Sequence, residues 1–208
     1  MILEPKYLFG MALQSIPEPR KIAREVQALR FSRAILWQVF ALFAVLSTGL
    51  GIAALILFPP DAEMLQMVVD YPFLSMVLNP MMGGLIEACF LVLTIFAIYW
   101  VGRTFGGTGR FDQAILTVIW VQYVMLLIQA TMLFLALVSG GIATLFLIFG
   151  TGLRFWILSH FIAEMHAFRS AGLVFVMILI TGFAALIVLS IFIALIGVGT
   201  LQAGGLHV

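Results

Sequence analysis

Five long apolar runs constrain this chain more than any other feature of its sequence. They cover residues 34–58, 80–102, 112–138, 143–167 and 172–199. Each has the roughly 20 residues that an α-helix needs to cross the hydrocarbon core of a bilayer. Lipid cannot satisfy free backbone N–H and C=O groups, so only helices and closed barrels cross it, and a barrel strand has only about 10 residues. The sequence therefore predicts an all-α polytopic membrane protein with five transmembrane helices.

The composition excludes a soluble domain and a nucleic-acid-binding protein. Hydrophobic residues make up 64% of the chain and charged residues 9%, against roughly 45 to 50% and 25% in soluble domains. The formal net charge of +1 gives no overall field that would attract nucleic acid. The first apolar run starts too late and is too long for a secretory signal, so we expect no cleaved leader. No linker divides the chain, which favours one membrane domain over residues 34–200.

The distribution of Lys and Arg predicts the orientation, because cytoplasmic flanks carry the excess of these residues. Six basic residues precede the first run, namely Lys6, Arg20, Lys21, Arg24, Arg30 and Arg33. Arg103 and Arg110 lie between the second and third runs, and Arg169 lies between the fourth and fifth. The loop 59–79 contains acidic residues and no Lys or Arg. We therefore expect a cytoplasmic N-terminus, an external C-terminus and an external tail over residues 201–208.

The N-terminal segment, residues 1–33, contains the pattern of an amphipathic helix. Ile22, Val26 and Leu29 recur at the spacing of one helical face, and basic residues occupy the other faces. Such a helix next to a span is expected to lie along the cytoplasmic headgroups and to attract anionic lipids. A docking site for a protein partner is the alternative. Helical spacing also predicts a short interfacial helix in the external loop before Tyr71.

The loop between the second and third runs, "VGRTFGGTGRFDQ", is glycine-rich. Gly106, Gly107 and Gly109 favour a tight reversal with positive φ, and Asp112 is expected to cap the next helix. The loop lacks the P-loop pattern, so a nucleotide-phosphate site is not indicated. The residues expected to form this turn and the contacts with lipid phosphates are Arg103, Gly106, Gly107, Gly109, Arg110, Asp112, His166 and Arg169.

Two stretches resemble the Yip family, the Ypt/Rab-GTPase-interacting membrane proteins, in its short prokaryotic form. They are "FGGTGRFDQAILTVIW" and "FWILSHFIAEMHAFRSAGLVFVMIL". The resemblance covers most of the chain and implies five spans with a cytoplasmic N-terminus. As a short prokaryotic form, it also implies a bacterial inner membrane protein without enzymatic activity. Eukaryotic members of the family are associated with vesicle trafficking through Rab-type GTPases and with membrane-shaping partners.

Several polar side chains interrupt the apolar runs. Arg154 and Glu87 are expected at similar depth, roughly 20 Å from the cytoplasmic ends of their helices, where each could reduce the cost of burying the other. His160 and Glu164 are one turn apart, and Gln122 and Gln129 share a stripe on the third run. The sequence therefore predicts an intramembrane polar cluster of Glu87, Gln122, Gln129, Arg154, His160 and Glu164.

Three roles for this predicted cluster remain open. It can be an interhelical network that fixes which helix faces pack together. It can be a proton or small-ion path through Glu87 and His160, or a site where Arg154 binds a lipid headgroup. No metal site is expected, because His166 projects away from His160 and Glu164 and no cysteine pair is present. No catalytic motif and no cofactor pattern is found.

The sequence thus predicts a non-enzymatic membrane protein that organises the membrane or binds partners. The alternative is a small transporter, channel or lipid-headgroup-binding protein. Small residues in several spans are also compatible with a homo-oligomer.

Overall fold

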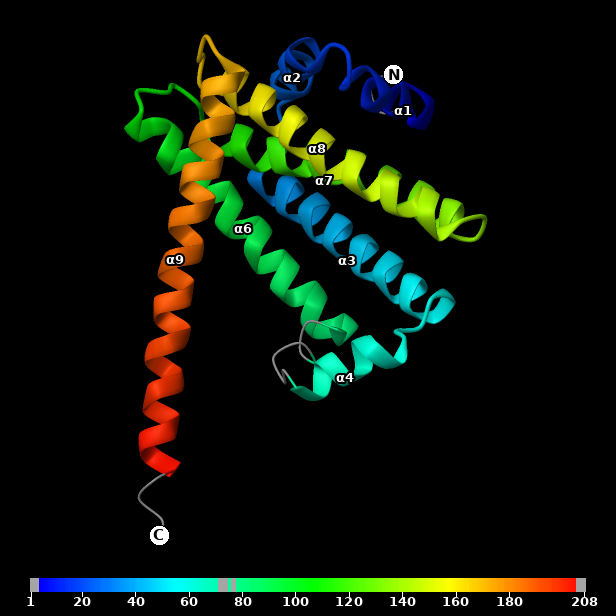
Figure 1. Ribbon diagram of the computed structural model, residues 1–208. Coiled ribbons are helices and arrows are strands. Elements are labelled where there is room, and N and C mark those ends of the chain that lie inside the picture. The colour runs from blue at the N-terminus through cyan, green and yellow to red at the C-terminus, as the bar shows by residue number, and fades with distance from the viewer. Residues whose placement is uncertain (1–3, 71–74, 76–77, 205–208) are drawn as a thin grey trace.

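The computed structural model describes residues 4–70, 75 and 78–204 (Figure 1). Two short helices come first, α1 (Pro5–Gln14) and α2 (Pro19–Ala28). The other helices are α3 (Arg33–Leu57), α4 (Ala62–Asp70), α6 (Pro80–Thr104), α7 (Phe111–Ala136), α8 (Gly140–Met165) and α9 (Ala171–Gly204). Within the described residues α3, α6, α7, α8 and α9 are long and apolar enough to cross a membrane. The fold is therefore all-helical and consistent with a five-span membrane protein.

Local sequence signals explain where these helices begin. The side chain of Ser32 accepts a hydrogen bond from the N–H of Ile35 at the start of α3. The side chain of Asn79 accepts from two free N–H groups at the start of α6, where Pro80 occupies the first helical position. The α7 start differs from the prediction. The side chain of Gln113 accepts from the N–H of Arg110 at 3.0 Å, and Asp112 instead binds arginines, so its predicted capping role is wrong.

Helix α7 is the centre of the bundle and packs against α3, α6 and α8. In an apolar stretch of 18 residues within α7, 39% of the residues are buried within the protein. In the corresponding stretch of α9 the share of buried residues is 6%. Helix α9 contacts α8 and diverges from α6 and α8 away from their shared end (Figure 1). Most residues of α9 between Ala171 and Ile191 therefore expose their side chains to the surroundings.

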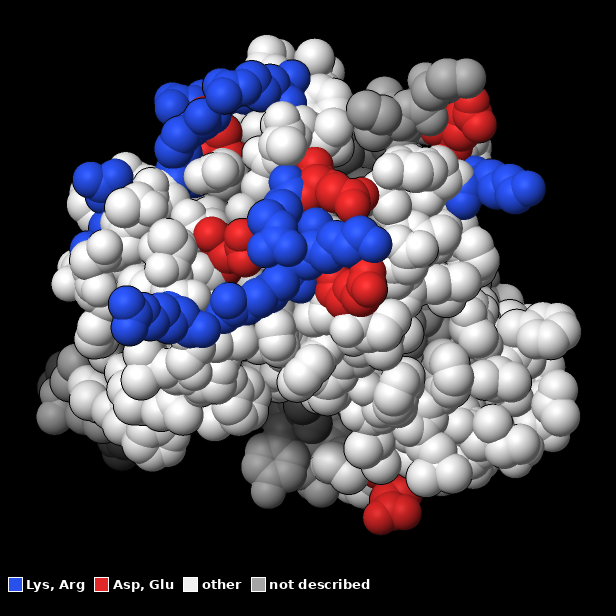
Figure 2. Space-filling model, turned by 90° about the horizontal axis from the view of Figure 1, so that it is seen from above, with Lys and Arg blue, Asp and Glu red and all other residues white. Residues whose placement is uncertain are grey.

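We call the end of the bundle that carries the α6–α7 loop and the α8–α9 turn the basic end. Every Lys and Arg residue other than Arg154 lies in α1, in α2, or where the other helices meet this end. Figure 2 shows Lys and Arg side chains gathered on this face with acidic side chains among them. Asp61 and Glu63 belong to the opposite end, where α4 lies (Figure 1).

The predicted amphipathic helix is present as α2, but its apolar face does not lie on lipid. Ile22, Ala23 and Val26 are 0% exposed and pack against α7 and α8. The bundle itself therefore covers this face, and the expectation that the basic side of α2 lies along the cytoplasmic headgroups stays a prediction. Leu29 follows the end of the helix and packs against the same core.

Two further predictions concern the loops and the C-terminus. The short helix predicted in the loop 59–79 is confirmed as α4, while Tyr71 lies outside the described residues. Helix α9 continues to Gly204, so residues 201–204 of the predicted tail are helical. Residues 205–208 of that tail lie outside the described residues.

Candidate functional site

Gln122 is the centre of a buried polar cluster in the middle of the bundle. Its side chain is only 3% exposed, and its Nε2 donates to Glu87 Oε1 at 2.9 Å and to Ser47 Oγ at 3.0 Å. Its Oε1 accepts from Arg154 Nη2 at 3.2 Å. One amide thus joins α3, α6, α7 and α8, because it uses both its donor and its acceptor atoms. We call Ser47, Glu87, Gln122 and Arg154 the Gln122 cluster.

Glu87 and Arg154 meet through Gln122 and not directly. The expectation that they lie at similar depth is consistent with this arrangement, but no direct ion pair joins them among the described residues. The Glu87 carboxylate still has a favourable electrostatic interaction with Arg154. The amide therefore separates two opposite charges and hydrogen-bonds to each.

Three residues of the predicted cluster lie outside the Gln122 cluster. His160 Nδ1 lies 2.8 Å from the carbonyl of Trp156, and its ring packs on the Trp156 ring. Glu164 pairs with Arg24 of α2 at 3.5 Å. Gln129 is partly buried two turns along α7 and makes no hydrogen bond with the described side chains of the cluster. The predicted continuous column is therefore divided between the membrane interior and the basic end.

His166 lies at the basic end, where the α8–α9 turn meets the α6–α7 loop. Its side chain is 2% exposed, so it does not contact lipid phosphates as predicted. The N–H of Gly109 donates to its Nδ1 at 3.2 Å, and its Nε2 lies 3.0 Å from the carbonyl of Ile98. Since Nδ1 accepts, Nε2 carries the proton and donates, which describes a neutral imidazole.

The glycines of the loop make room for this ring. A Cβ atom on Gly102, Gly107 or Gly109 would overlap the His166 imidazole. Gly106 has φ +83, so the predicted positive φ is confirmed at this one glycine of the turn. The glycine-rich loop is thus a close-packing surface for a histidine about sixty residues away in the sequence.

Burial favours the neutral form of this histidine. Desolvation lowers the pKa of His166, the hydrogen bond with the carbonyl of Ile98 opposes that effect, and the nearby Arg103 lowers the pKa further. The turn also contains Ala167 at φ 57, a left-handed conformation that costs energy for a residue with a Cβ. The contacts around this turn therefore hold Ala167 in an unfavourable backbone conformation.

The predicted arginines of the basic end have different partners. Asp112 binds Arg33 at 2.7 Å and Arg110 at 3.6 Å. The guanidinium of Arg103 lies over the ring of Tyr99, 5.7 Å from its centroid. Arg169 is exposed, and Arg20 donates from Nη2 to its carbonyl at 2.8 Å. Neither Arg103 nor Arg169 has an acidic partner within the described part of the chain.

Hydrogen bonds that were not predicted from the sequence join the N-terminal segment to the bundle. Trp120 Nε1 donates to Ser15 Oγ at 3.0 Å, and Trp156 Nε1 donates to the carbonyl of Ile16 at 3.1 Å. Gln27 Nε2 donates to the carbonyl of Phe161 at 3.1 Å. The available sequence signal was a tryptophan about nine residues from the basic end of each of two adjacent spans, because the indole N–H is a hydrogen-bond donor in an otherwise apolar segment.

Of the comparisons with known proteins, two found nothing: no curated protein and no solved structure matches the chain. The family model described as the Yip1 domain matches residues 13–193, from the end of α1 through most of α9. Members of this family are generally non-enzymatic membrane-trafficking proteins. Because the match covers most of its length, the chain belongs to the Yip1 family, as its resemblance to Yip proteins indicated.

Proposed function

We propose that this protein is a non-enzymatic component of a bacterial inner membrane that organises the membrane or binds a protein partner through its basic end. The observation that carries the proposal is the docking of α1 and α2 onto the basic ends of α7 and α8. This docking buries the apolar face of α2 and leaves Lys21 and Arg24 exposed. A folded, charged surface is thereby held in a fixed position at one side of the membrane.

The orientation is part of the proposal. An excess of Lys and Arg is typical of cytoplasmic flanks, and all such residues outside the spans belong to the basic end. The opposite end carries Asp61 and Glu63 on or beside α4. We therefore propose that the basic end faces the cytoplasm, where soluble partners would reach it.

The Gln122 cluster supports a structural role for the buried charges. Each of its four side chains has a hydrogen-bond partner within the cluster, and the partners come from four different spans. Polar contacts between spans fix which helix faces meet. The apolar groove between α6 and α9 has no lining residue from this cluster. A network of this kind keeps the spans in register beneath the basic end.

Cysteine accessibility tests the orientation. Cys89 is replaced by Ser, and a single cysteine is introduced by Lys21→Cys or by Glu63→Cys, because both native side chains are exposed at opposite ends. In inside-out vesicles an impermeant thiol reagent should label the Lys21→Cys protein and not the Glu63→Cys protein. In intact spheroplasts the pattern should reverse. Labelling of Glu63→Cys from the cytoplasmic side would overturn the orientation.

Photo-crosslinking tests partner binding. A photoreactive residue is placed at position 21, with position 63 as the control at the opposite end. We expect a discrete crosslinked protein from position 21 that is lost when Arg24→Glu reverses a neighbouring surface charge. A product that is equally abundant from position 63, or one that is insensitive to the charge, would contradict a specific partner. Proton or solute flux in vesicles that disappears in Glu87→Gln would instead favour a transporter.

A further inference from the structure

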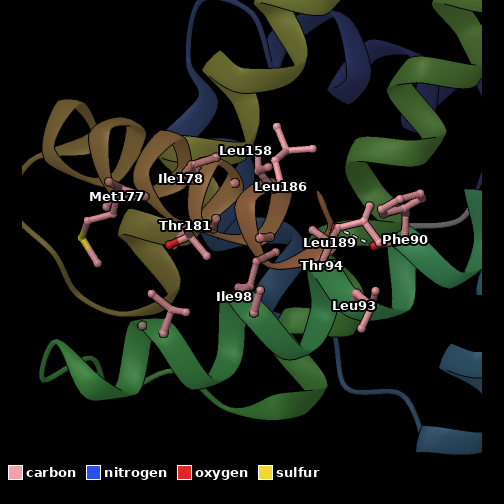
Figure 3. A pocket seen from close by; sticks show the side chains of 17 residues that line it. Phe90, Leu93, Thr94, Ile98, Leu158, Met177, Ile178, Thr181, Leu186 and Leu189 are labelled. Atoms are coloured by element: carbon pink, nitrogen blue, oxygen red, sulfur yellow. Dashed lines mark hydrogen bonds between the residues drawn. The ribbon is translucent and has the colours of Figure 1, made fainter. Parts of the chain in front are cut away.

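An apolar groove of about 410 Å³ runs between α6 and α9, with α8 at its back (Figure 3). Leu93 and Ile98 of α6 face Ile178 and Leu186 of α9 across it, and Leu158 comes from α8. The hydroxyl of Thr94 in the groove already donates to the carbonyl of Phe90 at 2.7 Å. The walls therefore offer apolar contact to an occupant.

The groove has the length of one leaflet. On α6 it extends from Gly102 at the basic end to Phe90. At a rise of about 1.5 Å per residue this distance is about 18 Å, close to half of the roughly 30 Å hydrocarbon core. The groove therefore has the length of the hydrocarbon chains in one leaflet, and its apolar walls suit such a chain.

The mouth of the groove is positively charged. Arg103 directly follows Gly102, and Arg169 lies in the turn that leads into α9, whose residue Val174 also lines the groove. His166 brings the two arginines to the same corner of the bundle. Its ring packs on Gly102, which precedes Arg103, and its own turn contains Arg169. The N-terminus of α9 adds the positive end of a helix dipole. No acidic side chain neutralises either arginine among the residues that the structure describes.

We propose that this groove binds one anionic phospholipid, with an acyl chain between α6 and α9 and its phosphate between Arg103 and Arg169. Guanidinium groups bind phosphate through paired, charge-assisted hydrogen bonds. The aromatic ring of Tyr99 beneath Arg103 limits the directions that this side chain can take. The lipid would fill the gap that α9 leaves when it diverges from α6. This inference holds for either orientation of the protein in the membrane.

Native mass spectrometry of the purified full-length protein tests the headgroup part. The probes are phosphatidylglycerol and phosphatidylcholine with identical chains. We expect one phosphatidylglycerol to bind about tenfold more tightly than phosphatidylcholine, and the double variant Arg103→Gln/Arg169→Gln to lose this preference. The control variant Lys6→Gln/Arg30→Gln removes two charges from the same end and should keep it. Equal loss in both double variants would overturn a specific phosphate site.

Filling the groove tests the acyl-chain part. Gly182 lines the groove and has open space at its Cβ position, so Gly182→Phe should reduce retention of both lipids. Gly49→Phe on α3 also enters open space and should leave retention unchanged. Ala97→Phe, from the α6 wall, provides a second filling variant.

Three results would overturn the proposal. The first is full retention of phosphatidylglycerol in both groove-filling variants. The second is competition by soluble glycerol phosphate as effective as that by the lipid, because it would indicate a free phosphate site. The third is a dimer of the purified protein that Gly182→Phe converts to a monomer, because it would assign the groove to a second copy.

Discussion

Gln122 and His166 are two buried polar residues through which distant parts of this chain contact one another. Gln122 uses its amide to satisfy a carboxylate, a guanidinium and a hydroxyl from three other spans. His166 uses both ring nitrogens to join the α8–α9 turn to the α6–α7 loop and to the last turns of α6. In each case one side chain satisfies several groups that lipid or protein would otherwise leave without partners.

Replacing Gln122 by Leu should destabilise the bundle. Three interhelical hydrogen bonds are lost, and at about 0.6 kcal/mol each the free energy of unfolding should fall by about 2 kcal/mol. Gln129→Leu is the matched control on the same helix, since Gln129 makes no hydrogen bond with the cluster. Unfolding in mixed micelles with increasing SDS measures both variants. Equal effects of the two substitutions would contradict the bridging role of Gln122.

The stability of the corner around His166 should depend on pH. The folded structure lowers the pKa of His166, so the unfolded chain binds a proton at higher pH than the folded chain. The stabilisation is therefore complete above the unfolded pKa of about 6.5 and is lost as pH falls towards the lower folded value. Protonation also places a donor on Nδ1 opposite the N–H of Gly109.

Thermal unfolding in detergent between pH 8 and pH 5 measures this effect. Wild-type protein should lose stability on acidification, and His166→Gln should be less stable at pH 8 but show a smaller pH dependence. The difference between the two curves isolates His166 from the other titrating groups. Parallel curves would show that His166 does not cause the pH dependence.

The apolar surfaces of α2 and α9 lie in different environments, although the sequence pattern predicts both helices. Helix α2 has a regular apolar face, and that face is fully buried against α7 and α8. Helix α9 is apolar on all sides and contacts mainly α8. Periodicity predicted both helices, but an apolar face packs equally well on lipid or on protein, so the sequence pattern did not distinguish the two environments.

A charge in the buried face of α2 should release the N-terminal helices. Val26 is 0% exposed, so Val26→Glu would bury a carboxylate and should undock α2 from the bundle. Trypsin should then cut faster at Arg20, Lys21, Arg24 or Arg30. Ala28→Glu introduces the same charge at an exposed position of the same helix and should leave the cutting rate unchanged. Equal rates in the two variants would contradict docking.

The molecule as a whole has a packed centre and a loosely attached last span. Helix α7 supplies much of the core and α9 supplies little of it, as their buried fractions show. The two parts meet at the basic end through the α8–α9 turn and His166. Stability should therefore be concentrated around α7.

Two isoleucine substitutions compare these parts directly. Ile115 on α7 is 0% exposed, and Ile115→Ala should cost about 2 to 4 kcal/mol because it leaves a cavity. Ile180 on α9 is 64% exposed, and Ile180→Ala should change the free energy of unfolding by about 0.5 kcal/mol or less. SDS-induced unfolding of both variants provides the measurement. Similar costs at the two positions would mean that α9 is packed more tightly than the structure indicates.

The amino-acid sequence was sufficient to predict the five spans, the α4 helix and the existence of α2, because span length and apolar periodicity are local properties. It also indicated that Glu87, Gln122 and Arg154 belong to a polar cluster, since charged and amide groups within spans need partners. The same reasoning placed Gln129, His160 and Glu164 in that cluster, and it did not find Ser47.

The contacts themselves depend on how helices far apart in the sequence pack. Depth along a helix follows from residue number, but rotation about its axis depends on the neighbouring helices, so Gln122 and not direct pairing joins Glu87 to Arg154. For the same reason the loop glycines surround His166, which lies about sixty residues away. Packing also covers α2 with protein and leaves a groove beside α9, because burial of apolar surface is non-directional and carries no information about its partner.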